Sequence, residues 1–192
     1  MCIRDSHNTD IHGDCAPQDT LSSSSYWQMG AAWLCLHIFE HYRYTEDENF
    51  LDEYLPYARE AALFFEDTLI SNSRGELIVS PTSSPENCYH LPNGEVGNLC
   101  AGTSMDSQIL YELFSGLIES KKISEEERER YENIVKNLPP IKLDSGGAIC
   151  EWTEPWEEVD KGHRHISHLF ALYPGTQIDF SDKTLTLAAE KT

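Results

Sequence analysis

Three histidines and one arginine lie close together in the segment GHRHISHLFALYPG, residues 162–175. Neutral imidazole rings bind metal ions, exchange protons near neutral pH and donate hydrogen bonds. A guanidinium group is a permanent cation that donates to oxygen atoms in a fixed geometry. His163, Arg164, His165 and His168 therefore admit two interpretations: a metal site, or a set of hydrogen-bond donors for a bound ligand.

The spacing H-x-H-x-x-H resembles the metal motif of metallo-β-lactamase-like hydrolases. That motif carries an aspartate directly before its third histidine, where this chain has Ser167. It also follows a strand in a layered α/β fold, whereas the surroundings here are typical of helices, and the charge of Arg164 would repel a nearby cation. We therefore predict no metal ion and no other cofactor, and we interpret Arg164 and His165 as donors to a ligand.

A single glutamate stands in a loop restricted by prolines, SPTSSPEN at residues 80–87. Pro81 and Pro85 limit the backbone freedom of this loop, which helps to hold the carboxyl group of Glu86 in one direction. A carboxyl group with apolar neighbours can arrive protonated and serve as a general acid. The alternative interpretation is a glutamate that is simply solvated.

Tryptophan and glutamate alternate in the segment CEWTEPWEE at residues 150–158. Indole rings stack on the C–H faces of sugars, while carboxylates accept hydrogen bonds from sugar hydroxyls. Trp152 is therefore a candidate for sugar binding. The same composition also fits an acidic loop that Trp152 and Trp156 anchor as buried side chains.

A fourth polar cluster lies near the start of the chain, in HNTDIHGDCAPQDT at residues 7–20. His7, Asn8 and Asp10 would form a polar wall of a binding site in one interpretation. In the other they belong to Asx turns and to capping carboxylates of a surface loop.

The elements that must position these residues are helices. Apolar spacing and capping residues predict helices at 21–45, with serine caps at 23–25, and at 47–71, 103–123, 124–138 and from 182 onward. Short strands are expected only at 76–80 and 148–152. Because strands and helices do not alternate, we predict an all-α toroid or bundle of helical hairpins with long functional loops.

Composition excludes several partners. The chain has 192 residues with 33 acidic and 14 basic side chains, a net charge of -19, which repels nucleic acid and anionic lipid surfaces. No apolar run approaches the roughly 20 residues needed to cross a bilayer. The 6 cysteines form no C-x-x-C pair, so we predict free thiols.

Six blocks taken together resemble glycoside hydrolase family 95, the bacterial inverting α-L-fucosidases, which also include members acting on α-L-galactosides. They occur in order from His7 to about Ile178: HNTDIHGDCAPQDT, YWQMGAAWLCLHIFEHY, SPTSSPEN, AGTSMDSQILYELF, EWTEPW and GHRHISHLFALYPG. The resemblance implies an (α/α)6 barrel as the catalytic domain. The chain is then expected to be a partial (α/α)6 barrel.

The resemblance also implies roles for the candidate residues. Glu86 would be the general acid that protonates the leaving oxygen of a terminal α-L-fucoside, of the α-1,2-linked type, in a reaction with inversion. Arg164 and His165 would bind the sugar hydroxyls. The other implied members of the sugar site are His7, Asn8, Asp10, Trp27, Asn87 and Trp152.

Parts of the family pattern do not occur in this sequence. In the family, asparagines that orient the water lie before the position of His7, and their aspartate partner lies beyond that of Thr192. Residues 1–6 match nothing in the family, so residues 7–192 are expected to be an internal fragment of the catalytic domain that is inactive alone.

Other functions stay open at this stage. An α-L-galactosidase, another (α/α)6 glycosidase or phosphorylase, and a non-catalytic glycan-binding helical module fit the same residues. The expected partner is a fucosylated oligosaccharide or glycan in the leading interpretation. Both a secreted or periplasmic and a cytoplasmic location are compatible with the sequence.

Overall fold

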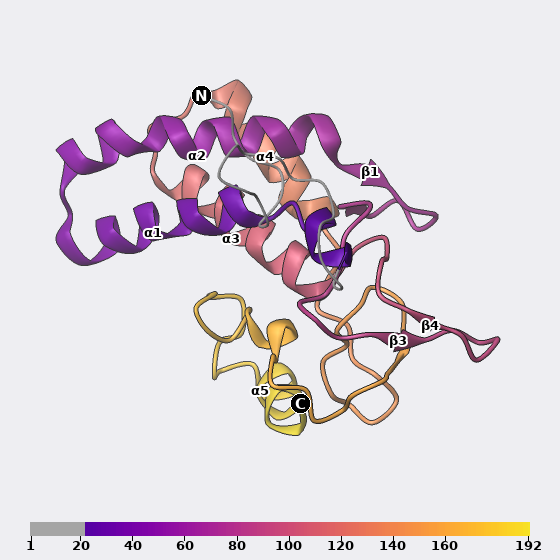
Figure 1. The fold of residues 1–192 in the computed structure, drawn as a ribbon. Coiled ribbons are helices and arrows are strands. Elements are labelled where there is room, and N and C mark those ends of the chain that lie inside the picture. The colour runs from indigo at the N-terminus through magenta and orange to yellow at the C-terminus, as the bar shows by residue number, and fades with distance from the viewer. Residues whose placement is uncertain (1–21) are drawn as a thin grey trace.

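A computed structural model describes residues 22–192 of the chain (Figure 1). His7, Asn8 and Asp10, predicted to belong to the site, lie outside the described residues, as do Cys2 and Cys15. In the described residues Cys35, Cys88, Cys100 and Cys150 are free thiols, which confirms the prediction for these positions.

The described chain is mostly helical, as predicted. Its helices are α1 Gly30–Thr45, α2 Glu48–Thr68, α3 Ser104–Glu119, α4 Glu125–Asn137 and α5 Lys183–Lys191, with the short 3₁₀ helices η1 Ser22–Tyr26 and η2 Ser167–Leu169. The strands have two residues each: β1 Ile70–Ser71, β2 Leu77–Ile78, β3 Tyr89–His90, β4 Val96–Gly97 and β5 Glu157–Glu158. Residues 22–192 do not by themselves close a toroid (Figure 1).

Side-chain caps set the start of α3 and α4. Thr103 accepts a hydrogen bond from the backbone N–H of Asp106, whose carboxylate accepts the N–H of Thr103 in return. Ser124 and Glu127 form the same reciprocal pair at α4. Such capping boxes satisfy N–H groups that have no partner inside the helix. The predicted Thr or Ser cap of α3 is therefore confirmed as Thr103.

The start of α1 differs from the prediction. The serines fall in η1, and α1 begins at Gly30 with Met29 at its N-cap and no side-chain capping bond. The physical reason is burial: Trp27 and Met29, 6% and 0% exposed, turn inward between the two elements. The backbone carbonyl of Ser23 is also held from outside the helix, by the hydroxyl of Ser83 at 3.2 Å.

Helix α3 forms the centre of the core. Helices α1 and α2 make a hairpin, and α3 packs against both of them and against α4 (Figure 1). The most completely buried face of α3 carries apolar side chains that are at most 1% exposed: Ile109, Leu110, Leu113, Phe114 and Leu117. Burying a large apolar side chain stabilises a fold by roughly 1.5–3 kcal/mol, so this face makes α3 the rigid base for the loops that leave its N-terminal end.

The two long loops contain small antiparallel pairs. Strand β1 pairs with β2, and β3 lies between β4 and β5. The strand predicted at 76–80 is reduced to β2, and the one predicted at 148–152 does not form. In its place are single bridges from Ile149 to Leu143 and from Trp152 to Thr103, because these residues bond to two different segments rather than to one partner strand.

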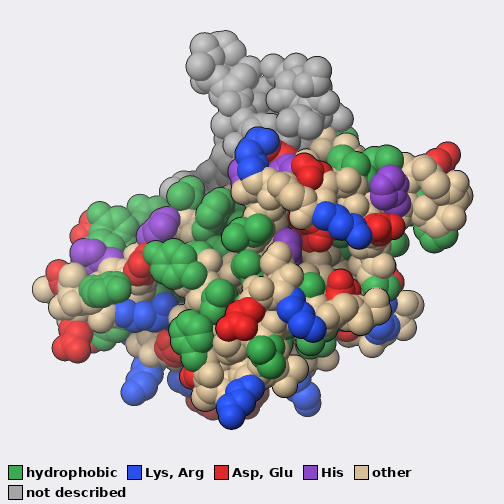
Figure 2. Space-filling model, turned by 90° about the horizontal axis from the view of Figure 1, so that it is seen from below, with side chains coloured by type: hydrophobic (Ala, Val, Ile, Leu, Met, Phe, Trp, Pro, Cys, Tyr) green, Lys and Arg blue, Asp and Glu red, His purple; other side chains and the backbone are tan. Residues whose placement is uncertain are grey.

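Apolar side chains remain on the surface of the described residues. Leu34, Tyr44, Tyr173 and Phe180 are each at least 70% exposed. Figure 2 shows one face on which hydrophobic side chains gather between charged ones. Contiguous exposed apolar surface is typical of contact sites. Among residues 22–192, no helix combines the length and apolar character that crossing a membrane requires.

Gly116 of α3 packs directly against the ring of Phe39 in α1. A Cβ at this position would lie 2.5 Å from the Phe39 ring. Alanine raises helix propensity, but the ring must move, so we expect Gly116→Ala to lower the free energy of unfolding by about 1–3 kcal/mol. Urea unfolding followed by far-UV circular dichroism measures the change. In a Phe39→Leu background the same substitution should cost less; an equal cost in both backgrounds would contradict the contact.

Candidate functional site

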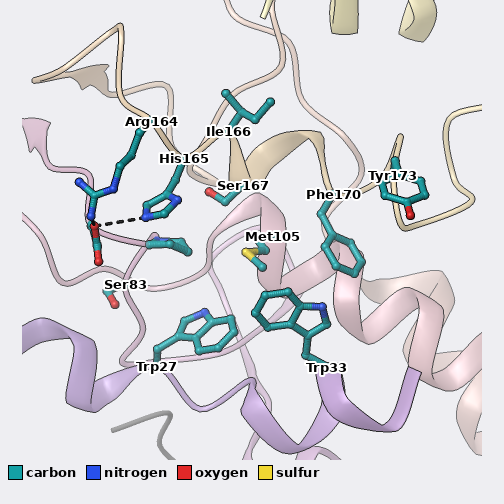
Figure 3. A pocket seen from close by; sticks show the side chains of 12 residues that line it. Trp27, Trp33, Ser83, Met105, Arg164, His165, Ile166, Ser167, Phe170 and Tyr173 are labelled. Carbon is teal, nitrogen blue, oxygen red and sulfur yellow. Dashed lines mark hydrogen bonds and ion pairs between the residues drawn. The ribbon is translucent and has the colours of Figure 1, made fainter. Parts of the chain in front are cut away.

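A pocket of ≈ 450 Å³ opens between the loop at 83–86, the segment at 164–173 and the start of α1 (Figure 3). Arg164 and His165 lie at one end, and Trp33, Phe170 and Tyr173 at the other, with Trp27 and Met105 between them (Figure 3). The pocket is lined by Trp27, Trp33, Ser83, Pro85, Glu86, Met105, Arg164, His165, Ile166, Ser167, Phe170 and Tyr173.

Three of the predicted residues meet at the polar end. The carboxylate of Glu86 accepts a hydrogen bond from Nη2 of Arg164, and its Oε2 lies 3.2 Å from Nε2 of His165. The Glu86 side chain is 33% exposed, so this group is half-covered and reachable from the pocket. The structure thus brings together residues 78 and 79 positions apart in the sequence.

The backbone of Glu86 adopts a left-handed conformation, with φ 63°. A residue with a Cβ disfavours this region, at a cost of order 1–3 kcal/mol, and such conformations cluster at functional sites. Surrounding contacts must therefore hold the acid loop, residues 82–87, in place.

The three histidines make different contacts. The ring nitrogen Nδ1 of His163 accepts the backbone N–H of His165 at 3.1 Å, and the His165 ring faces Glu86. His168 is only 5% exposed, and burial lowers its pKa to about 4, so it is neutral at pH 7. Within residues 22–192 no three His, Cys, Asp or Glu side chains are arranged to hold a metal ion.

Helix α3 also positions the histidine segment. The buried side chain of Gln108 donates to the carbonyl of His168 at 3.0 Å and accepts the backbone N–H of Ala171 at 2.8 Å. The two polar groups of one amide therefore hold His168, within η2, and Ala171, just after it, against α3. Arg164 and His165 precede this anchored turn, so the anchoring of η2 also fixes the position of their backbone.

Aromatic rings form the apolar side of the pocket. Trp27 meets Trp33 edge to face with centroids 5.7 Å apart, and Trp33 meets Phe170 in the same way at 6.4 Å. Trp27 was predicted, whereas sequence analysis missed Trp33, Met105 and Tyr173 as pocket residues. The only sequence signal was the presence of large apolar residues beside the polar motifs, which core residues share.

A buried carboxylate, Asp106, lies beneath this wall at 1% exposure. Burial raises its pKa to about 6, and the nearby polar groups of Thr82, Thr103 and Trp27 oppose that rise. The same carboxylate that caps α3 thus lies near Thr82, the first residue of the acid loop, and near the indole of Trp27.

Two predicted site residues lie behind the pocket. Trp152 is 1% exposed and packs edge to face on Tyr89, with centroids 5.3 Å apart. Asn87 is 3% exposed, and its Nδ2 donates to Oε2 of Glu151 at 3.0 Å and to Oε2 of Glu158 at 3.3 Å. Neither residue lines the pocket, so in this structure both support its wall.

The chain is similar in sequence to proteins of one known family. A family model for the glycosyl hydrolase family 95 catalytic domain matches residues 3–192. The chain is 34% identical over 175 residues to alpha-L-fucosidase 2 of Arabidopsis thaliana, covering 88% of the chain and 21% of that protein. It is 29% identical over 173 residues to probable alpha-fucosidase A of Aspergillus niger, covering 84% and 21%. The chain spans about a fifth of the length of these curated relatives.

The buried His168 predicts a dependence of stability on acid. Its pKa is 6.5 in the unfolded reference and about 4 in the fold, so the unfolded chain gains a proton first as the pH falls. Its contribution to the free energy of unfolding is therefore complete above pH 6.5 and lost toward pH 4, by an amount on the order of 3 kcal/mol.

Urea unfolding at pH 7 and pH 4, with His168→Leu for comparison, measures this contribution. The raised pKa of Asp106 acts in the opposite direction but is common to both proteins, so it cancels in the difference. We expect the variant to lose less stability than the unsubstituted chain on acidification. The same loss in both proteins would show that His168 is not the group responsible.

Proposed function

Because the chain belongs to glycosyl hydrolase family 95, we propose that it forms part of the catalytic site of an enzyme that hydrolyses terminal α-L-fucosides. The proposed linkage class is α-1,2, and the proposed outcome is inversion at the anomeric carbon. The substrate is then a fucosylated oligosaccharide or glycan. The names of both relatives, which are fucosidases, support this choice of sugar.

The observation that carries the proposal is the meeting of Glu86, Arg164 and His165 at one end of a pocket with an aromatic wall. Sugars present hydroxyls on their edges and C–H groups on their faces. Guanidinium and imidazole groups match the hydroxyls, and rings such as Trp33 match the faces. A pocket of ≈ 450 Å³ falls in the size range of small-molecule sites.

In the proposed reaction Glu86 donates its proton to the glycosidic oxygen while the bond from that oxygen to the anomeric carbon breaks. A water molecule attacks the same carbon from the opposite face, which inverts its configuration. A general acid must carry its proton before the bond breaks. We therefore propose that sugar hydroxyls take over the donors of Arg164 and His165 and release Glu86 from them.

The groups that activate the water are proposed to lie in other parts of the whole protein. We also propose that residues 7–192 contribute helical hairpins to an (α/α)6 barrel. The hairpin of α1 and α2 and the short connection between α3 and α4 support this arrangement. The family match begins at residue 3, within residues 1–6, which were predicted to match nothing in the family.

Substitution of Glu86 tests the role of the acid. In the whole protein, we expect Glu86→Gln to lower kcat on a 2′-fucosylated oligosaccharide by about 10²–10⁴-fold, because Gln cannot donate a proton as a carboxylic acid does. Release of free fucose measures the rate, and calorimetry measures sugar binding, which should persist. Glu60→Gln, at an exposed position of α2, is the matched control. Unchanged turnover of Glu86→Gln would remove Glu86 from the role.

The 192-residue chain by itself should release no fucose, because it holds the proposed acid without the water-activating groups. The assay compares the purified chain with the whole protein at equal molar concentration and equal incubation time. Hydrolysis by the chain alone would place water activation within these residues and contradict the proposal.

A further inference from the structure

Glu151 is a second buried carboxylate, and it lies directly behind the acid loop. It is 2% exposed. Its Oε1 accepts hydrogen bonds from the hydroxyls of Ser84 and Ser167, the latter at 3.4 Å. Its Oε2 accepts from Nδ2 of Asn87 at 3.0 Å. Three donors from two different segments therefore converge on one side chain.

These donors sit beside the residues that meet in the pocket. Ser84 precedes Glu86 by two positions and Asn87 follows it directly, so Glu151 holds the loop on both sides of the acid. Ser167 stands two positions after His165. The hydroxyls of Ser84 and Ser167 also lie 3.2 Å apart, which joins the two segments to each other.

Glu151 is itself fixed to the rigid part of the fold. Its carbonyl accepts the backbone N–H of Ser104, the first residue of α3, at 3.0 Å. The next residue, Trp152, forms a bridge with Thr103 and is buried. The carboxylate thus extends from the N-terminal end of the central helix to the two segments of the pocket.

Burying the ionised carboxylate of Glu151 costs free energy. Burial and the nearby carboxylate of Glu158 raise the pKa of Glu151, and hydrogen bonds from Ser84 and Asn87 oppose the rise. A buried polar group that is fully bonded fixes the geometry of its neighbours more strictly than apolar packing does. Glu86 needs such fixing, because its left-handed backbone is unfavourable.

We propose that Glu151 is a positioning residue that holds the carboxyl group of the acid Glu86 in the orientation that proton donation requires. It acts through Ser84, Asn87 and Ser167 and touches no substrate. This role rests on the proposed function of Glu86. Its consequence is specific: loss of Glu151 should impair proton donation by Glu86 rather than the stability of the pocket as a whole.

Two substrates with different leaving groups separate these effects. Cleavage of a 2′-fucosylated oligosaccharide needs a proton on the leaving oxygen, whereas an α-L-fucosyl fluoride releases fluoride with much less need of one. In the whole protein, we expect Glu151→Gln to lower kcat on the oligosaccharide by about 10–100-fold and kcat on the fluoride by less than about 3-fold. Glu86→Gln should show the same pattern with a larger loss on the oligosaccharide.

The matched control is Glu157→Gln, an exposed carboxylate of the same loop that pairs with Lys161 at 2.9 Å and should leave both rates unchanged. Ser84→Ala removes one donor without changing a buried charge, and should reproduce the pattern at smaller amplitude if Glu151→Gln does not fold. Equal losses on both substrates, or no loss, would overturn the positioning role alone. No hydrolysis of either substrate by the unsubstituted protein would overturn the proposed function, and the positioning role with it.

Discussion

The pocket depends on the rule that a buried charge must be bonded. Two carboxylates, Asp106 and Glu151, lie at or beside the N-terminal end of α3, and each is at most 2% exposed. Asp106 accepts the backbone N–H of Thr103 at the start of α3, and Glu151 accepts hydrogen bonds from Ser84 and Asn87 in the acid loop. Because leaving the carboxylate of Glu151 unpaired would be costly, the loop that carries Ser84 and Asn87 has one favourable position. The left-handed conformation of Glu86 persists because contacts on both sides impose it.

The same helix determines how the two walls of the pocket meet. Gln108 of α3 holds the turn that follows His165, while Met105, one helical turn earlier, lines the pocket. Helix α3 therefore holds the segment 164–173, which contributes Arg164 and His165 to one end of the pocket and Phe170 and Tyr173 to the other. A site on such a base keeps its geometry with less dependence on loop motion. The buried apolar face of α3 thus contributes to function as well as to stability.

Periodicity and capping residues predicted the helices, because these signals are local, whereas the family resemblance implied that Glu86, Arg164 and His165 belong to one site. Local signals do not show where a residue bonds to or packs against a distant segment. The serines before α1 form a 3₁₀ turn because Trp27 and Met29 are buried there. Trp152 and Asn87 resemble sugar-binding residues in type but lie behind the wall, bonded or packed against other buried groups. Trp33 carries no local mark that separates a pocket residue from a core residue.

The backbone of Glu86 also sets the stability of the loop against the role proposed for its carboxyl group. Glycine adopts a φ of 63° at little cost, so a glycine at this position would suit the loop better than glutamate does. Selection for a more stable chain would therefore favour loss of the very carboxyl group that the pocket presents. Natural variation at this position then reports which pressure dominates. A relative with glycine at this position would gain stability in the loop and lack the proposed acid, whereas a relative with glutamate would keep the acid at a cost in backbone energy.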